Sequence, residues 1–137
     1  MNILLIDGQG GKMGRRLAEE ITARFPEQTL TVVGTNSVAT SAMLKGGASQ
    51  GATGENAVIV CSRRADVIVG PIGIVIADSM LGEITPKMAL AVAQSDAVKI
   101  LIPANRCNHL VAGMKGQSLS ELMEDTLEKI AELAKGY

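Results

Sequence analysis

Four glycines near the N-terminus form the clearest candidate for a binding site. Gly8, Gly10, Gly11 and Gly14 follow a short apolar run, Asn2–Ile6, and precede apolar residues with helical spacing. This pattern predicts a buried strand, a glycine turn and a helix. Glycine lets the backbone bend and approach a bulky anion, and the helix N-terminus points unpaired N–H groups at the same place. We therefore predict a phosphate-binding loop; the alternative is that the glycines only permit a tight turn.

The loop does not follow the strict G-x-G-x-x-G pattern, because Met13 stands where the last glycine is required. A glycine at every third position, 8, 11 and 14, is the pattern that fits. With its neighbours, the loop GQGGKMGRRL resembles the cofactor loop of dihydrodipicolinate reductases, which use NADP or NAD, over this stretch only. Replacing Gly11 by Val is expected to abolish binding and to leave folding largely intact. The candidate phosphate-binding residues are Gly8, Gln9, Gly10, Gly11, Lys12, Met13 and Gly14.

The end of the second predicted strand, Leu30–Val33, bears on which nucleotide binds. The residues that follow it are Thr35, Asn36 and Ser37. NAD-binding sites place an acid here to hold the ribose 2′-hydroxyl, and none is present. Hydroxyl and amide groups can instead hydrogen-bond a 2′-phosphate, with Arg15 or Arg16 as counter-charge. NADP or another phosphorylated nucleotide is therefore favoured as cofactor over NAD, although Asn36 or Ser37 could simply cap a helix and the arginines could pair with nearby glutamates.

Ligands of open parallel sheets bind beyond the carboxyl ends of the strands, so two further segments are candidates. One follows the predicted strand Asp66–Gly70. The other is the polar stretch after the predicted strand Val98–Ile102, where Arg106 offers a contact for an anion. The ligand-binding candidates from these two segments are Gly70, Pro71, Asn105 and Arg106.

Four residues are candidates for catalysis. Cys107 and His109 could form a thiolate–imidazole pair. Asp78 and Glu83 are isolated acids in an apolar stretch and could act as a general acid or base. The alternatives are an inert loop cysteine and carboxylates that cap helices. We expect no metal site, because Cys61 and Cys107 lie far apart and form no CxxC pair.

Composition limits the classes of function. The chain has 137 residues, 47% of them hydrophobic and 20% charged, which predicts one folded domain, residues 1–137. A net charge of −1 and an aromatic content of 1% argue against nucleic acid as a partner. The longest apolar stretch, 67–77, is too short to span a bilayer. With no secretory pattern and only two separated cysteines, we expect a cytoplasmic protein with no membrane partner.

The remaining elements follow from helix signals and apolar periodicity. The expected helices are 12–25, 37–45, 85–95 and one that opens with the capping box 118–121. Residues 48–64 suit a helix or a strand, and we favour a helix; His109–Ala112 could be a last short strand. Alternating strands and helices predict an α/β fold: a Rossmann-like, open, mostly parallel sheet of about five strands with helices on both faces.

Four segments taken together carry a wider resemblance. In order, they are IDGQGGKMG, GATGENA, GPIGIVIADSMLGEITPKMA and ILIPANRCNHLVAG. They resemble a small bacterial family known as a domain of unknown function, over nearly the whole chain. The resemblance implies a stand-alone domain and brings no activity or ligand with it.

Three hypotheses for the function remain open at this point. The first is a domain that binds a small-molecule ligand, NADP or another phosphorylated nucleotide. The second is a small NADP-linked oxidoreductase, and the third is a structural or interaction protein without a ligand. The apolar segments Ile72–Leu81 and Leu119–Ala134 also predict a homodimer or small homo-oligomer, unless both are ordinary core.

Overall fold

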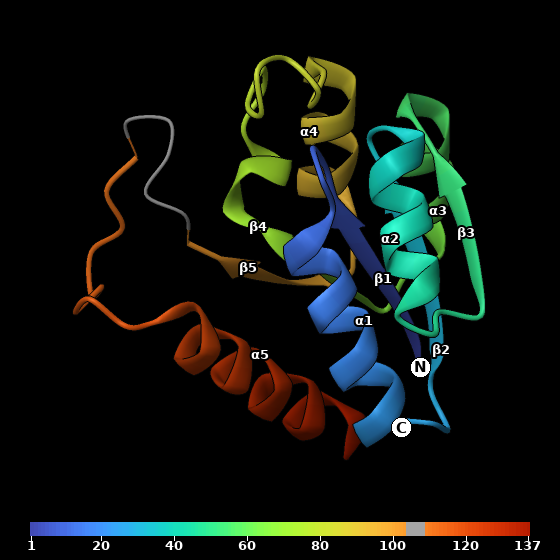
Figure 1. Ribbon diagram of the computed structural model, residues 1–137, viewed down its shortest axis with the longest axis vertical. Coiled ribbons are helices and arrows are strands. Elements are labelled where there is room, and N and C mark those ends of the chain that lie inside the picture. Colours follow the sequence, from blue (N-terminus) through green and yellow to red (C-terminus); the bar gives the residue numbers. More distant parts are fainter. Residues whose placement is uncertain (104–108) are drawn as a thin grey trace.

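Five parallel strands form the sheet of the computed structural model, which describes residues 1–103 and 109–137. They are β1 (Asn2–Asp7), β2 (Thr29–Gly34), β3 (Gln50–Thr53), β4 (Val67–Pro71) and β5 (Val98–Ile102). Their order is β3-β2-β1-β4-β5, and each neighbouring pair is parallel. The strand β1 therefore lies at the centre (Figure 1). This confirms the Rossmann-like α/β class.

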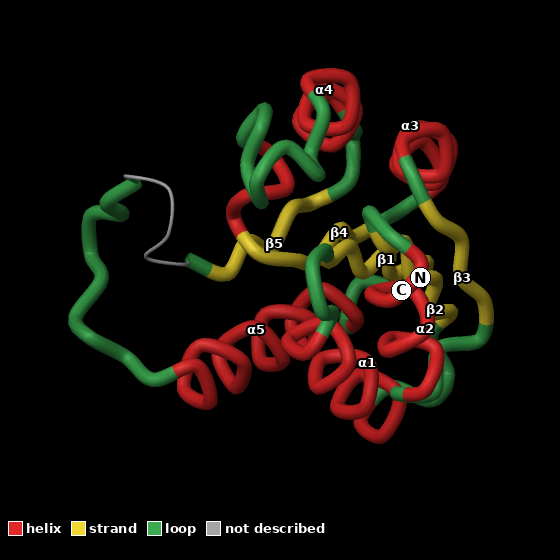
Figure 2. The backbone as a smooth tube through the Cα atoms, turned by 45° about the horizontal axis from the view of Figure 1, so that its top comes forward, coloured by secondary structure: helices red, strands yellow, loops and turns green. Residues whose placement is uncertain are grey.

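Helices cover both faces of the sheet, as expected. One face carries α1 (Lys12–Arg24), α2 (Ser37–Lys45) and α5 (Leu119–Ala134). The other carries α3 (Glu55–Arg64), α4 (Pro86–Gln94) and the short 3-10 helix η1 (Ile72–Val75). Figure 2 shows the two helical layers with the sheet between them. No helix in residues 1–103 or 109–137 is long and apolar enough to cross a membrane.

The position of β1 at the centre of the sheet explains why residues 3–6 form one continuous apolar run. Ile3 and Leu5 pack against α1 and α2, whereas Leu4 and Ile6 pack against α3 and α4. A parallel strand covered by helices on both faces buries every side chain, so its sequence does not alternate. The loops after β1, β2 and β4 then leave the same edge of the sheet.

Helix caps account for several boundaries. Asn36 caps α2 through its side chain, which accepts the Ala39 N–H at 2.9 Å. Thr85 caps α4 with Pro86 in the first helical position, and Ser118 caps α5 in a reciprocal pair with Glu121. These caps confirm the helix starts predicted from sequence.

Two predictions about strands need correction. His109–Ala112 forms no strand; its side chains are exposed and the chain there runs away from the sheet (Figures 1 and 2). The fifth strand is β3, which the sequence did not reveal because QGAT is a mostly exposed edge strand without an apolar run. The helix favoured within residues 48–64 is confirmed as α3.

Candidate functional site

The candidate site lies where the chain reverses its direction across the sheet. From β1 it proceeds outward through β2 and β3, then crosses to β4 on the other side. Open α/β sheets bind ligands beyond the carboxyl ends of the strands at such a switch point. Three segments meet here: the loop Gly8–Gly11, the residues after β2, and residues 76–84 after η1, which we call the cover segment.

Asp7 holds the glycine loop from the inside. This last residue of β1 is 6% exposed, and its carboxylate accepts the N–H groups of Gly8 and Gly14, each at 2.8 Å. Burial raises the pKa of Asp7 above its ordinary value, the two hydrogen bonds oppose this, and the charge of Glu83 raises it further. This role of Asp7 was not predicted from the sequence. The signal for it is an acid directly after the apolar run Ile3–Ile6, because a carboxylate buried there must find hydrogen-bond partners.

At the start of α1, three backbone N–H groups are without a hydrogen-bond partner among the described residues. Gly11 is left-handed, with φ of 72°, and its own N–H donates to the Gly8 carbonyl at 3.0 Å. The N–H groups of Gly10, Lys12 and Met13 have no hydrogen-bond partner in the described part of the chain. They lie at the positive end of the helix dipole.

The loop glycines differ in what surrounds them. A Cβ on Gly11 would lie 2.7 Å from the Cα of Ala39, and one on Gly14 would lie 2.7 Å from the Met43 sulfur. These two glycines let α1 and α2 pack closely. Gly11→Val would therefore disturb folding, and the expectation that it leaves folding intact is wrong. A Cβ on Gly10 meets nothing within 4 Å, so this glycine faces open space.

Glu83 of the cover segment joins the glycine loop to the end of β2. Its Oε1 accepts hydrogen bonds from the Gln9 N–H at 2.9 Å, the Thr35 hydroxyl at 2.6 Å and the Asn36 amide at 2.8 Å. Partial burial raises the pKa of Glu83, but these three hydrogen bonds lower it more, so the net pKa lies below its ordinary value. The structure thus brings together four residues that sequence reasoning singled out separately.

The cover segment is strained and is held by hydrogen bonds within itself and to η1. Asp78, Met80 and Leu81 have positive φ values of 68°, 56° and 56°. The Asp78 N–H donates to the Ile84 carbonyl at 2.7 Å, and the Ser79 hydroxyl donates to the Gly73 carbonyl at 2.5 Å. Such strain persists only where the surrounding structure enforces it, and it concentrates at functional sites.

Met80 and Leu81 have opposite environments within the cover segment. A Cβ on Gly8 would lie 2.7 Å from the Met80 sulfur, so Met80 covers the start of the loop. Leu81, the next residue, is 98% exposed. The cover segment therefore shields Gly8 and leaves Gly10 open.

None of the other predicted ligand contacts donates a hydrogen bond to Glu83 in the described structure. Gly70 and Pro71 are buried at the end of β4, and a Cβ on Gly70 would lie 2.5 Å from the Ile6 carbonyl oxygen. Ser37 is exposed as the first residue of α2. The polar partners of the two arginines in the described structure lie elsewhere: Arg15 pairs with Glu19 at 3.1 Å and Arg16 donates to Ser120 at 3.2 Å.

The structure describes three of the four residues predicted as catalytic candidates. Glu83 lies in the cluster, whereas Asp78 and His109 are exposed. The predicted residues Asn105, Arg106 and Cys107 lie outside the described residues, so the Cys107–His109 pair stays a prediction. Within the described residues, no three His, Cys, Asp or Glu side chains gather as a metal-binding group.

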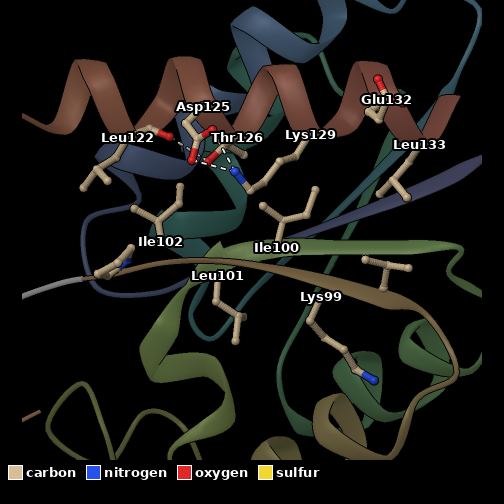
Figure 3. A pocket seen from close by; sticks show the side chains of 12 residues that line it. Lys99, Ile100, Leu101, Ile102, Leu122, Asp125, Thr126, Lys129, Glu132 and Leu133 are labelled. Atoms are coloured by element: carbon tan, nitrogen blue, oxygen red, sulfur yellow. Dashed lines mark hydrogen bonds and ion pairs between the residues drawn. The ribbon is translucent and has the colours of Figure 1, made fainter. Parts of the chain in front are cut away.

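A separate pocket of about 420 Å³ lies between β5 and α5, at the free edge of the sheet. Ile100, Leu122 and Leu133 give it an apolar lining, and Lys129 pairs with Asp125, one turn earlier on α5, at 2.7 Å (Figure 3). Figure 3 shows Ile100 and Ile102 pointing toward α5 while Leu101 and Lys99 point away. This pocket does not include any residue of the glycine loop.

Comparison with known proteins shows the fold and the family. A dodecameric FMN-dependent UbiX-like decarboxylase from Escherichia coli O157:H7 is similar, with a TM-score of 0.50 and 14% identity over 98% of this chain and 76% of that chain. At this identity the similarity shows the fold alone. No curated protein matches the chain. The family model described as Domain of unknown function (DUF3842) matches residues 2–135, which confirms the resemblance seen in the sequence, and the chain therefore belongs to the DUF3842 family.

Proposed function

We propose that the chain binds a phosphorylated nucleotide or dinucleotide at the glycine loop. The observation that carries this proposal is the set of unpartnered N–H groups on Gly10, Lys12 and Met13, beside the glycine that faces open space in the described structure. Backbone N–H groups at a helix N-terminus hold phosphate oxygens through hydrogen bonds and the helix dipole. The exposed Lys12 side chain adds a positive charge at the same turn.

The place in the fold supports the same ligand. The loop leaves the central strand at the switch point, where α/β sheets of this kind bind nucleotides. The polar groups of Gln9, Thr35 and Asn36 gather next to it. These groups already donate to Oε1 of Glu83, so the group that they present to a nucleotide beyond the phosphate is the Glu83 carboxylate.

The structure removes the reason for expecting NADP to be favoured over NAD. That preference rested on the lack of an acid after β2, but Glu83 of the cover segment reaches the same place and contacts Thr35 and Asn36. The ligand panel must therefore include both dinucleotides, with ATP and CoA. FMN belongs in the panel because the protein of similar fold is described as FMN-dependent.

Calorimetric titration of the purified protein with NAD, NADP, ATP, FMN and CoA tests the proposal. At least one should bind, and Gly10→Val should weaken that binding about tenfold or more, because a side chain there blocks approach to the N–H groups. Folding should persist, since a Cβ on Gly10 meets no atom within 4 Å. Gly136→Val, at the chain end beyond α5, is the matched control.

Two outcomes would contradict the proposal. If nothing in the panel binds, the protein acts without such a ligand and the structural or interaction hypothesis takes its place. If a nucleotide binds equally well to wild type and to Gly10→Val, the glycine loop is only a turn.

We also propose that the chain forms a homodimer or small homo-oligomer through the free edge of the sheet. Much of the apolar stripe on α5 is ordinary core, since Met123, Leu127 and Ile130 are buried. The pocket between α5 and β5 remains open, and Val98 beside it is 49% exposed. A second copy of the chain would cover this apolar surface and the edge strand. The decarboxylase of similar fold is described as a dodecamer, which is consistent with assembly.

Light scattering at micromolar concentration tests the assembly. Wild type should show a mass above that of one chain, and Val98→Lys should lower it, because a charge would enter the contact. Ser41→Lys, on the exposed side of α2, is the control. A monomer mass that does not change with concentration would overturn this proposal, whatever the nucleotide result.

A further inference from the structure

We infer that Glu83 recognises the ribose of the bound nucleotide, so that the site accepts a free 2′-hydroxyl and rejects a 2′-phosphate. The inference rests on the proposed function and names the ligand class more closely. In NAD-binding sheets this recognition comes from an acid at the end of the second strand. Here the acid comes from the cover segment, between β4 and α4, and reaches the same place.

The first step is that one carboxylate oxygen of Glu83 is held by other residues of the chain. Oε1 accepts hydrogen bonds from Gln9, Thr35 and Asn36, which belong to the glycine loop and the residues after β2. The Asn36 amide also donates to the Gln9 carbonyl at 2.9 Å, which ties these two segments together. The carboxylate is thus held in position by groups from elsewhere in the chain.

The second step is that the other oxygen is available. Oε2 of Glu83 makes no hydrogen bond to any described residue. An ionised carboxylate accepts hydrogen bonds and donates none. A ribose hydroxyl can donate to it, whereas a phosphate has no suitable donor and carries a like charge.

The third step is that a phosphate on the glycine loop does not need Glu83 to leave. The N–H groups of Gly10, Lys12 and Met13 are free of partners in the described structure while Glu83 is in place. Ile84, the next residue, is 1% exposed, and its carbonyl accepts the Asp78 N–H. The backbone beside Glu83 is therefore fixed, and its carboxylate could leave only by turning away and giving up its three hydrogen bonds.

Repulsion at one position is an effective way to obtain specificity. A site discriminates between two ligands by the difference in their binding free energies, and an unfavourable contact with the wrong ligand contributes directly. NAD and NADP differ only by the 2′-phosphate. A fixed carboxylate at the ribose therefore separates the two without any further contact.

The test compares NAD and NADP on wild type and on Glu83→Gln by calorimetry. Glutamine keeps an acceptor for all three donors but removes the charge, so folding should persist. Wild type should bind NAD at least about tenfold more tightly than NADP, and Glu83→Gln should reduce this ratio to about threefold or less by gaining affinity for NADP. Glu128→Gln, exposed on α5, makes the same charge change and should keep the wild-type ratio.

Each remaining outcome overturns the inference in a distinct way. NADP binding as tightly as NAD to wild type, or a ratio unchanged in Glu83→Gln, removes the discriminating role. Equal tightening of both ligands in Glu83→Gln identifies Glu83 as a plug. If ATP, FMN or CoA binds but neither dinucleotide does, the proposed function stands and this inference fails. If nothing binds, both fail.

Discussion

Asp7 and Glu83 hold the same glycine loop by adjacent backbone groups. Asp7, the last residue of β1, accepts the N–H of Gly8 at 2.8 Å. Glu83, in the cover segment, accepts the N–H of Gln9 at 2.9 Å. The Glu83 charge raises the pKa of Asp7. Two negative charges therefore lie on one short loop, and removing the charge of Glu83 should change the pKa of Asp7.

The pKa of Asp7 should report on this pairing. Glu83→Gln removes the negative charge that helps raise the pKa of Asp7, so that pKa should fall. Titration of the Asp7 carboxyl carbon by NMR measures the change. Glu128→Gln, which makes the same charge change on α5, should leave the titration of Asp7 as in wild type. An unchanged Asp7 pKa in Glu83→Gln would contradict the coupling.

The stability contributed by Glu83 should depend on pH with a defined sign. Its folded-state pKa is lowered, so its charged form stabilises the fold above the pKa of Glu in an unfolded chain, about 4.3. That contribution is lost as pH falls through the lower, folded-state pKa. Wild type should therefore be more stable than Glu83→Gln at pH 7, and the difference should shrink below about pH 4.

Urea unfolding of both proteins between pH 3 and pH 7 measures this difference. Glu128→Gln serves again as the control, because Glu128 is exposed on α5 and lies outside the Glu83 cluster. A difference between wild type and Glu83→Gln that grows toward acid pH would show that Glu83 does not stabilise the fold in its charged form.

Substitutions at the buried Gly11 and the open Gly10 should separate folding from binding. Gly11→Val places a side chain in a left-handed residue, at a cost of about 1–2 kcal/mol, and adds a contact at 2.7 Å with the Ala39 Cα. It should lower the free energy of unfolding by more than that cost. Gly10→Val should change it by no more than about 0.5 kcal/mol. Equal stability of the two variants, by urea unfolding, would contradict the packing role of Gly11.

The sequence predicted the elements of the fold that are determined by neighbouring residues. The apolar run of β1, the cap at Asn36 and the capping box at Ser118 each depend on neighbouring residues, and the structure confirms them. The strand β3 was not predicted, because an exposed edge strand that contains Gly51 has no apolar pattern. Its place in the sheet comes from pairing with β2, which is a tertiary contact.

Only part of the candidate site could be predicted from the sequence, because the rest depends on tertiary contacts. The loop and the residues after β2 follow from the general architecture of α/β sheets. Glu83 lies 74 positions from Gln9, and no local pattern relates the two. Its position depends on how the strained turns at Asp78, Met80 and Leu81 direct the chain back over the loop.

Asn36 should show two separable roles, and two substitutions distinguish them. Its Oδ1 caps α2 by accepting the Ala39 N–H, while its Nδ2 donates to Glu83. Asn36→Ala removes both and should cost about 0.5–2 kcal/mol from the lost cap alone. Asn36→Asp keeps a good cap but replaces a donor with a negative charge beside the Glu83 carboxylate, so it should raise the pKa of Glu83. NMR titration of Glu83 and urea unfolding measure the two effects. If Asn36→Asp leaves the pKa of Glu83 unchanged, the amide does not hold the carboxylate in solution, and the anchoring of Glu83 depends on Gln9 and Thr35 alone.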